Sequence, residues 1–223
     1  RRSAVTGGSR QGCGITPAMG GGGVRGFFDD RFVRNYDRCL APLERVAFAE
    51  ARNRLIRKAT GLVLDLGAGT GSNFGCFVPP VRRVIGVDRD IRMLERSSDR
   101  NRSVPVYLTV ADAEALPFRS GLFDTVIATL VFCTIPRPEV ALAELVRVLV
   151  PGGRALFLEH VRSSASLVGF AQDLANPLQR IVAGGCNLNR RTESMLDGAG
   201  LRIDRRSSRF AGILVEIEAI SAT

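Results

Sequence analysis

The sequence has no tryptophan, one histidine and one lysine among its 223 residues, and aromatic side chains make up 6% of it. So few aromatic residues leave little material for the base-stacking platforms of proteins that bind single-stranded nucleic acids. Apolar runs are short as well. The best candidate, residues 122–135, is interrupted by Asp124 and falls short of the roughly 18 residues that a helix needs to cross a bilayer. We therefore expect no transmembrane segment and no nucleic-acid partner.

The cysteines are few and dispersed. The closest two of the five, Cys13 and Cys39, are 26 residues apart, so the sequence contains no Cys-x-x-Cys pair. Structural zinc sites are usually built on such pairs, and His160 is the only histidine available as a further ligand. We predict that no metal is bound. An odd number of scattered cysteines is typical of reduced thiols in a cytosol, so the cytoplasm is the expected location.

Acidic residues are outnumbered by basic ones, which gives a net charge of +9 at pH 7, and all but one of the 31 basic residues are arginine. The resulting field favours anionic partners. The arginines are spread over the whole chain, however, and their two densest groups, within residues 52–57 and 202–209, are interpreted as solvated faces. An anionic acceptor or a peripheral contact with a lipid surface is the alternative that this charge leaves open.

Residues 1–26 differ in composition from the rest of the chain. They are rich in glycine and arginine, contain no acidic residue and have hardly any large apolar side chain. Such a segment cannot bury enough apolar surface to offset its ordering entropy. We therefore expect a flexible leader over residues 1–26 and one folded domain over residues 27–223. The hydrophobic content of 45% is sufficient for a core in that domain.

Within that domain, short apolar runs alternate with helical patterns. A first helix is expected around residues 27–36 and a second after Pro42, ending near residue 60. Alternating strands and helices indicate right-handed βαβ units. The predicted fold class is therefore α/β, with a doubly wound, mostly parallel, seven-stranded Rossmann-like sheet and an N-terminal helical cover. The expected strands are 62–66, 83–87, 104–110, 123–129, 155–160, 202–205 and 213–220, and the later helices are 91–99, 139–149, 166–182 and 192–199.

A glycine-rich loop follows the first of these strands, in residues 62–71 (Leu-Val-Leu-Asp-Leu-Gly-Ala-Gly-Thr-Gly). Alternating glycines let the backbone turn tightly and approach a ligand. The dinucleotide pattern G-x-G-x-x-G would need a glycine where Ser72 stands. Asp65, two residues before the first glycine, favours a cofactor that carries a positive amino group.

Further motifs follow in order along the chain. Asp88 ends the second strand, 17 residues after Gly71, in the region where such folds place a ribose-binding carboxylate. Residues 111–118 (Ala-Asp-Ala-Glu-Ala-Leu-Pro-Phe) follow the third strand, residues 123–128 enter the fourth, and residues 149–154 form a turn before the fifth. Taken together, these motifs resemble those of the class I S-adenosylmethionine-dependent methyltransferases over about residues 28–220.

The resemblance implies S-adenosylmethionine as the cofactor and a small molecule as the methyl acceptor. It also assigns residues to the cofactor, by position in these motifs. Asp65, Gly67 and Gly69 would hold the methionine moiety, with Gly71 in the same loop, and Ala68 and Asn73 are further cofactor-binding residues. The remaining assignments are Asp88 at the ribose hydroxyls, Arg89 and Met93 beside the adenine, Asp112 and Ala113 at the adenine amino group, and Thr129 and Leu130 at the sulfonium.

A narrower resemblance concerns the acceptor. Residues 70–74 followed by Pro79-Pro80, together with residues 129–135, 158–161 and 185–190, are similar to the methyltransferase-like thiol S-methyltransferases, which methylate small alkyl thiols. The Tyr36-Asp37 pair also resembles the ubiquinone/menaquinone C-methyltransferases and bacterial phospholipid N-methyltransferases. The animal thiol enzymes carry an N-terminal hydrophobic anchor, which these residues do not show.

On the similarity of these motifs, transfer to a thiol is the first expectation. The alternatives are C- or N-methylation of a quinone precursor or phospholipid and, more remotely, a partner subunit that binds cofactor without turnover.

Two residues are candidates for catalysis. His160 is expected at the ligand-facing end of the fifth strand, where it would accept a proton or orient the nucleophile, unless a nearby carbonyl simply caps it. Tyr36 would close over the sulfonium with its ring face, or pack the N-terminal helix. Methyl transfer needs the nucleophile held about 3–3.5 Å from the methyl carbon, and a thiol is already partly ionised at neutral pH. Positioning is therefore expected to matter more than a base.

Overall fold

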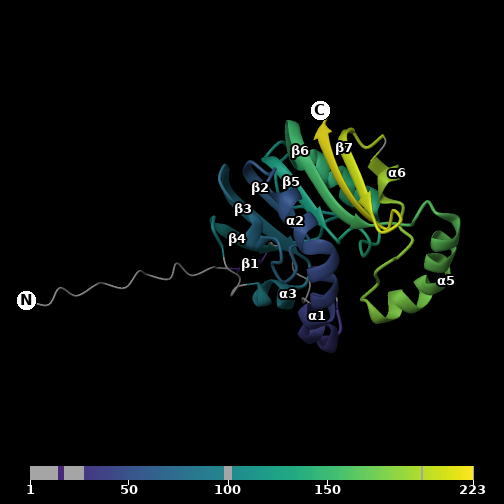
Figure 1. Cartoon of the computed structure of the whole chain (residues 1–223). Helices are drawn as coiled ribbons and strands as arrows, with labels where there is room; N and C mark the ends of the chain where they lie inside the picture. Colours follow the sequence, from purple (N-terminus) through teal and green to yellow (C-terminus); the bar gives the residue numbers. More distant parts are fainter. Residues whose placement is uncertain (1–14, 18–27, 98–101, 197, 223) are drawn as a thin grey trace, which may run out of the picture.

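The computed structural model describes residues 15–17, 28–97, 102–196 and 198–222. In this part of the chain, eight strands form one sheet in the order β1-β4-β3-β2-β5-β6-β8-β7 (Figure 1). All neighbours from β1 to β6 are parallel, whereas β8 is antiparallel to both β6 and β7. This confirms the mostly parallel, Rossmann-like sheet. The strands are β1 (Ile15–Pro17), β2 (Gly61–Leu66), β3 (Val81–Asp88), β4 (Val106–Val110), β5 (Phe123–Thr129), β6 (Leu149–His160), β7 (Leu201–Arg209) and β8 (Leu214–Ser221).

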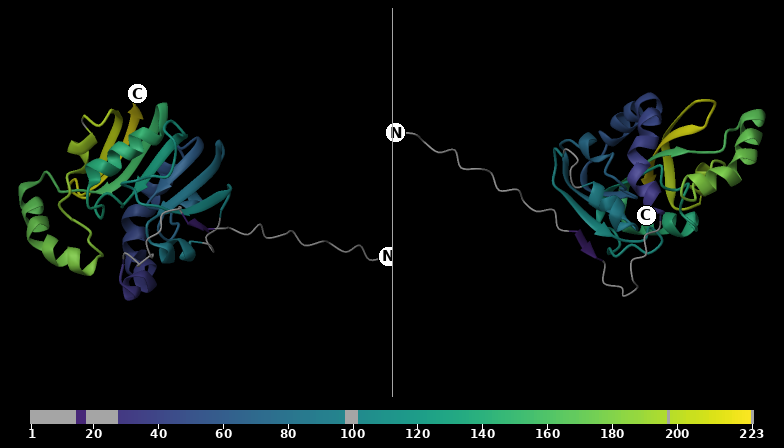
Figure 2. Two further views of the ribbon diagram at one scale, coloured as in Figure 1. Left: turned by 180° about the vertical axis from the view of Figure 1, so that it is seen from behind. Right: turned by 90° about the horizontal axis from the view of Figure 1, so that it is seen from below.

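Helices cover both faces of the sheet (Figure 2). Buried side chains of α2 pack with one face, together with Val63 and Val84, and buried side chains of α4 pack with the other, together with Leu64 and Leu66. Neighbouring residues of one strand thus face opposite layers, as strand geometry requires. The helices are α1 (Asp30–Leu43), α2 (Ala49–Ile56), α3 (Ile91–Arg96), α4 (Pro138–Val148), α5 (Ser166–Val182) and α6 (Thr192–Leu196).

Strand β1 was not predicted, and it lies inside the segment expected to be flexible. Its three residues pair in parallel with the edge strand β4, from Ile15 opposite Leu108 to Pro17 opposite Val110. Pairing at a sheet edge depends on backbone hydrogen bonds rather than on buried apolar area, so the composition of residues 1–26 could not reveal it. The other residues of the predicted leader lie outside the described part of the chain.

Two predicted boundaries were wrong. Pro42 does not separate two helices: it lies within α1, which continues through a π-helical turn, Glu44–Phe48, directly into α2. A proline removes one hydrogen bond, and the widened turn that follows lets the helix run on. Strand β6 also starts earlier than expected, because Leu149 pairs with Phe123 and residues 150–154 extend the strand instead of forming a separate turn.

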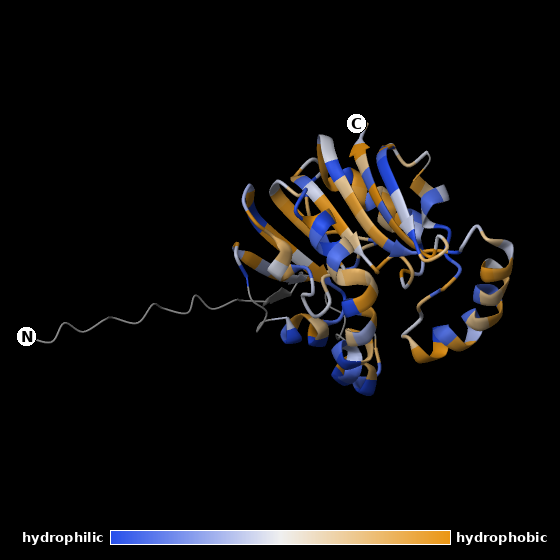
Figure 3. Ribbon diagram, in the orientation of Figure 1, coloured by the Kyte–Doolittle hydropathy of each residue, from blue (hydrophilic) through white to orange (hydrophobic). Residues whose placement is uncertain are grey.

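Helix α5 occupies the predicted residues 166–182 and stands beside the body of the domain (Figure 3). Large apolar side chains spaced three and four residues apart are exposed along one side of this helix. We call this set the α5 apolar stripe; its members are Leu167, Phe170, Leu174, Leu178 and Ile181. Among the described residues, no helix is both long and apolar enough to span a membrane.

Candidate functional site

The carboxyl ends of the parallel strands β2 to β6 meet at one edge of the sheet, which is where open α/β folds bind ligands. Two clefts lie at this edge, and Gly67 lines both. The first, of about 60 Å³, is bordered by the ends of β3 and β4. The second, of about 300 Å³, lies between the glycine loop and helix α1.

The glycine loop after β2 needs glycine for conformational and steric reasons. Gly67, Gly69 and Gly71 have φ values of 69°, 53° and 77°, a region that side chains disfavour. A Cβ atom on Gly67 would lie 2.2 Å from Cγ2 of Val131. The Ala68 amide donates to the carbonyl of Val87 at 2.8 Å. The loop is thereby held against the strand ends, with its backbone facing the clefts.

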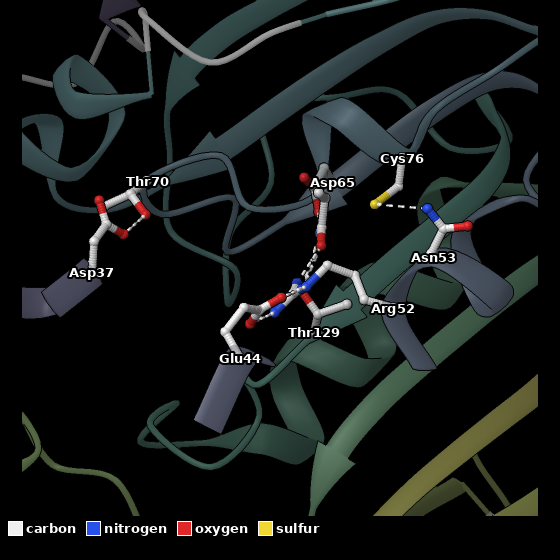
Figure 4. A network of polar contacts seen from close by, with 9 residues as sticks. Asp37, Glu44, Arg52, Asn53, Asp65, Thr70, Cys76 and Thr129 are labelled. Carbon is white, nitrogen blue, oxygen red and sulfur yellow. Dashed lines mark hydrogen bonds and ion pairs between the residues drawn. The ribbon is translucent and has the colours of Figure 1, made fainter. Parts of the chain in front are cut away.

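Asp65 lies at the end of β2 and is fully buried (Figure 4). Its Oδ1 accepts a hydrogen bond of 2.6 Å from Nδ2 of Asn73, while its Oδ2 is buried with no partner among the described residues. Burial raises the pKa of Asp65 to about 7. A buried carboxylate with a free oxygen calls for a cationic partner, because desolvation of an unpaired charge is costly. Asp65 and Asn73 therefore lie side by side at the end of β2, next to the glycine loop.

Arg52, on α2, was missed by the sequence reasoning. It had been grouped with solvated arginines, but it is 5% exposed and reaches the same network. Its guanidinium pairs with both carboxylate oxygens of Glu44, at 2.8 and 3.0 Å, and donates to Asn73 and, at 3.1 Å, to Oγ1 of Thr129 (Figure 4). No local signal marks Arg52 in an arginine-rich helix. Only the packing of α2 over the sheet edge brings it inward.

Asp88 ends β3 and anchors the first cleft. Its Oδ2 accepts from the Gly69 amide at 3.0 Å and its Oδ1 from the Asp90 amide at 2.9 Å. Burial raises its pKa to about 6. Arg89 and Asp112 form an ion pair of 3.8 Å at this cleft, and Ala113 lines it. Met93, expected beside the adenine, is instead 2% exposed and lies beneath Gly69 rather than in the cleft lining.

The second cleft is covered by α1, which is joined to the glycine loop by a hydrogen bond of 2.6 Å from Thr70 Oγ1 to Asp37 Oδ1 (Figure 4). Burial raises the pKa of the Tyr36 hydroxyl, and the negative groups of Cys133 and Asp88 raise it further. Leu130, just after β5, has φ of 55°, an uncommon conformation for a leucine and one that clusters at functional sites. The lining consists of Tyr36, Asp37, Leu40, Ala41, Glu44, Arg45, Arg52, Gly67, Ala68, Gly69, Thr70, Ser72, Asn73, Thr129 and Leu130.

His160, the other candidate for catalysis, lies at the end of β6 but lines neither cleft. Its Nε2 lies 3.0 Å from Sγ of Cys186, so its partner is a thiol and not the carbonyl that the alternative interpretation expected. Burial lowers the pKa of His160, but the pairing with Cys186 and the neighbouring carboxyl group of Glu159 together raise it above its ordinary value. Glu159, which the sequence reasoning missed, is fully buried beside it and accepts from the amides of Val131 and Phe132 at 3.0 and 3.1 Å.

Comparison with known proteins identifies the domain. Residues 64–157 match the methyltransferase domain family. The chain is 31% identical over 179 residues to the thiol S-methyltransferase TMT1A of Homo sapiens, an alignment that covers 78% of this chain and 73% of the human protein. It is 37% identical over 123 residues to the ubiquinone/menaquinone biosynthesis C-methyltransferase UbiE of Pseudomonas fluorescens (strain Pf0-1), covering 52% of this chain and 48% of that protein.

Solved structures share the fold at low sequence identity. An S-adenosylmethionine-dependent methyltransferase from Thermotoga maritima superposes with a TM-score of 0.64 at 20% identity, covering 86% of this chain and 97% of that one. Another, from Mesorhizobium loti, gives a TM-score of 0.63 at 15% identity, covering 80% and 99% of the two chains. These two structures show that the chain shares their overall fold.

Proposed function

The chain belongs to the class I S-adenosylmethionine-dependent methyltransferases, and we propose that it transfers the methyl group to the sulfur of a small thiol. The cofactor is S-adenosylmethionine, which supplies an electrophilic methyl group on a sulfonium. The observation that carries the thiol assignment is the 31% identity to a thiol S-methyltransferase over 78% of this chain.

The residues at the sheet edge fit this cofactor. The unpartnered Oδ2 of Asp65 would pair with the amino group of the methionine moiety, and Arg52, already held by Glu44, would face its carboxylate. Asp88 would bind the ribose hydroxyls at the border of the two clefts, while Asp112 and Ala113 would contact the adenine in the first cleft. Each of these groups is fixed by its own hydrogen bonds or strand before the cofactor binds.

The second cleft supports a small, partly apolar acceptor. Leu40 and Ala41 of α1 and Leu130 of the β5 end contribute apolar surface, and Tyr36 adds its ring over the glycine loop. These groups orient the acceptor and exclude water from the sulfonium, which favours reaction with an anionic sulfur. A thiol is already partly ionised at neutral pH, so positioning by the cleft contributes directly to the rate.

A carbon or nitrogen acceptor is the second candidate function. The identity to the quinone C-methyltransferase favours it, and so does the α5 apolar stripe, which would hold a lipid-like acceptor or a lipid surface. A cofactor-binding subunit without turnover is disfavoured because Asp65 and Asp88 are both present and positioned. The four cysteines of the described residues, Cys39, Cys76, Cys133 and Cys186, are free thiols, which supports a reducing location such as the cytoplasm.

The test is a methyl-transfer assay with labelled S-adenosylmethionine against alkyl and aryl thiols, quinols and phosphatidylethanolamine, each offered separately. Asp88→Ala removes a carboxylate from the cofactor site, and Asp204→Ala is the matched control because Asp204 is exposed on β7. We expect label on thiols with the wild type and Asp204→Ala, and none with Asp88→Ala. Cofactor binding with no transfer to any thiol would refute the thiol assignment.

A further inference from the structure

Three side chains that can bind a metal meet near the carboxyl ends of β5 and β6, outside the lining of both clefts. The Sγ atoms of Cys133 and Cys186 and a ring nitrogen of His160 all lie within 4.8 Å of one another. They come from distant segments: the loop after β5, the end of β6 and the turn after α5. The sequence reasoning that predicted no metal looked for ligands close together in the chain, and it could not detect a set that only the fold assembles.

The segments that carry these side chains are tied to one another. The carbonyl oxygen of Cys133 accepts hydrogen bonds from the amide and from Nδ2 of Asn187, at 3.0 and 2.8 Å. Glu159 accepts from the two amides that precede Cys133 in its loop. Backbone and buried side-chain contacts therefore tie the segments that carry the three side chains to one another.

From this geometry we propose that Cys133, His160 and Cys186 form a three-ligand site for a divalent metal, zinc by its ligand chemistry, with a fourth position that receives the acceptor thiolate. Two thiolates and one imidazole are a known zinc donor set, and sites with three protein ligands keep a position for water or substrate. Zn–S and Zn–N bonds of about 2.3 and 2.0–2.1 Å put tetrahedral ligand atoms roughly 3.5–3.8 Å apart. From the 4.8 Å limit, the ligand atoms would have to approach one another by about 1.3 Å at most, while the pair formed by His160 Nε2 and Cys186 Sγ, now 3.0 Å apart, would move apart by roughly 0.5 Å.

A buried polar atom next to the cluster gives independent support for a bound ion. Glu159, the residue before His160, is fully buried, and its Oε2 has no hydrogen-bond partner among the described residues. Buried polar atoms of native proteins nearly always have partners, so an unpaired one often marks an ion or water site. The ring nitrogen of His160 that faces Cys186 is Nε2, and this is the nitrogen that would coordinate the metal.

The position of the cluster connects it to the reaction, and this part rests on the proposed thiol acceptor. Cys133 shares its loop with Leu130, which lines the second cleft, and its Sγ lies 3.5 Å from the Leu130 carbonyl oxygen. A thiol that binds the fourth position loses its proton to solvent and is held as the thiolate. Its sulfur forms a bond to the methyl carbon while the sulfonium C–S bond breaks and leaves its electron pair on the cofactor sulfur. The product thioether is neutral, coordinates weakly and leaves.

The experiment is metal titration of the full chain, stripped with chelator and kept under a non-thiol reductant. Zinc is measured by elemental analysis, and cobalt by its visible and thiolate charge-transfer absorption. We expect one metal per chain with thiolate-type cobalt bands, and an increase in Kd of more than about 100-fold in Cys133→Ser and Cys186→Ser. Cys76→Ser is the matched control, since Cys76 is a partly exposed thiol outside the cluster. Melting temperature and S-adenosylmethionine affinity, measured on every variant, establish that it is folded.

The outcomes separate the two proposals. No binding by the folded wild type, or equal binding by wild type and both cluster variants, would overturn the metal site. Metal binding without thiol methylation would leave the site standing and refute the proposed function. Thiol methylation at the full rate after metal removal, by contrast, would overturn the role of the metal in activating the acceptor while leaving the thiol assignment intact.

Discussion

Replacing Gly67 with alanine tests the geometry of the cofactor loop. Gly67 has φ of 69°, and its added Cβ would lie 2.2 Å from Cγ2 and 2.8 Å from Cβ of Val131. The left-handed conformation alone costs an alanine roughly 1–2 kcal/mol. The forced displacement of Val131 adds about 1–3 kcal/mol, as overpacking does elsewhere. The free energy of unfolding should therefore fall by about 2–5 kcal/mol.

Gly152→Ala is the matched control for this substitution. Gly152 has nearly the same φ, 73°, but no atom lies within 4 Å of its added Cβ. In denaturant unfolding, Gly152→Ala should show only the conformational cost, a loss of about 1–2 kcal/mol in the free energy of unfolding, which is less than the loss in Gly67→Ala. Isothermal titration should show weakened S-adenosylmethionine binding in Gly67→Ala alone, since Gly67 lines both clefts. Equal destabilisation of the two variants, with unchanged cofactor affinity, would refute the close approach described here.

Three further predictions follow from buried and exposed groups. Burial raises the pKa of Asp65 from 3.8 to about 7, so protonated Asp65 stabilises the cofactor-free protein fully below about pH 4, and this stabilisation is lost as the pH rises through 7. Denaturant unfolding between about pH 4 and pH 8 should show the loss. The Asp65→Asn variant should not show this pH dependence. Cofactor affinity, measured by titration, should instead increase from pH 6 to 8 as Asp65 ionises. Arg52→Met should lower the free energy of unfolding by about 1–3 kcal/mol, because it removes the partner of the half-buried Glu44 and of the buried Asn73. Arg57→Met, at an exposed position just after α2, should change it little. Leu174→Glu in the α5 apolar stripe should reduce the fraction of protein that sediments with anionic vesicles. Ser166→Glu adds the same charge outside the stripe and should leave this fraction unchanged. Equal sedimentation of the two variants would contradict a contact between the stripe and lipid.

The sequence was sufficient to predict what local patterns encode. The apolar run that ends in Asp65, the alternating glycines and Asp88 at the next strand end identify the cofactor site because each is a property of one strand and its loop. The helical period of residues 166–182 predicted α5 with its correct bounds. Parallel strands then bring the separate motifs to one edge, so the fold class sufficed to place them together.

The features that the sequence did not reveal depend on contacts between distant segments. Arg52 is buried only because α2 lies across the sheet edge, and an arginine-rich composition conceals it. The edge strand β1 depends on backbone pairing with β4, which leaves no compositional trace. The cluster of Cys133, His160 and Cys186 joins a loop, a strand end and a turn from distant parts of the chain, and no spacing rule covers such a set.

The most direct test of the central claim is a competition in one reaction mixture. S-Adenosylmethionine labelled with carbon-13 at its methyl group would be offered together with an alkyl thiol, a quinol and phosphatidylethanolamine, and the products followed by NMR. We predict an S–CH₃ resonance that grows one for one with S-adenosylhomocysteine in the wild type and is absent in Asp65→Ala. Label on a quinol carbon or a lipid nitrogen, with none on sulfur, would contradict the account.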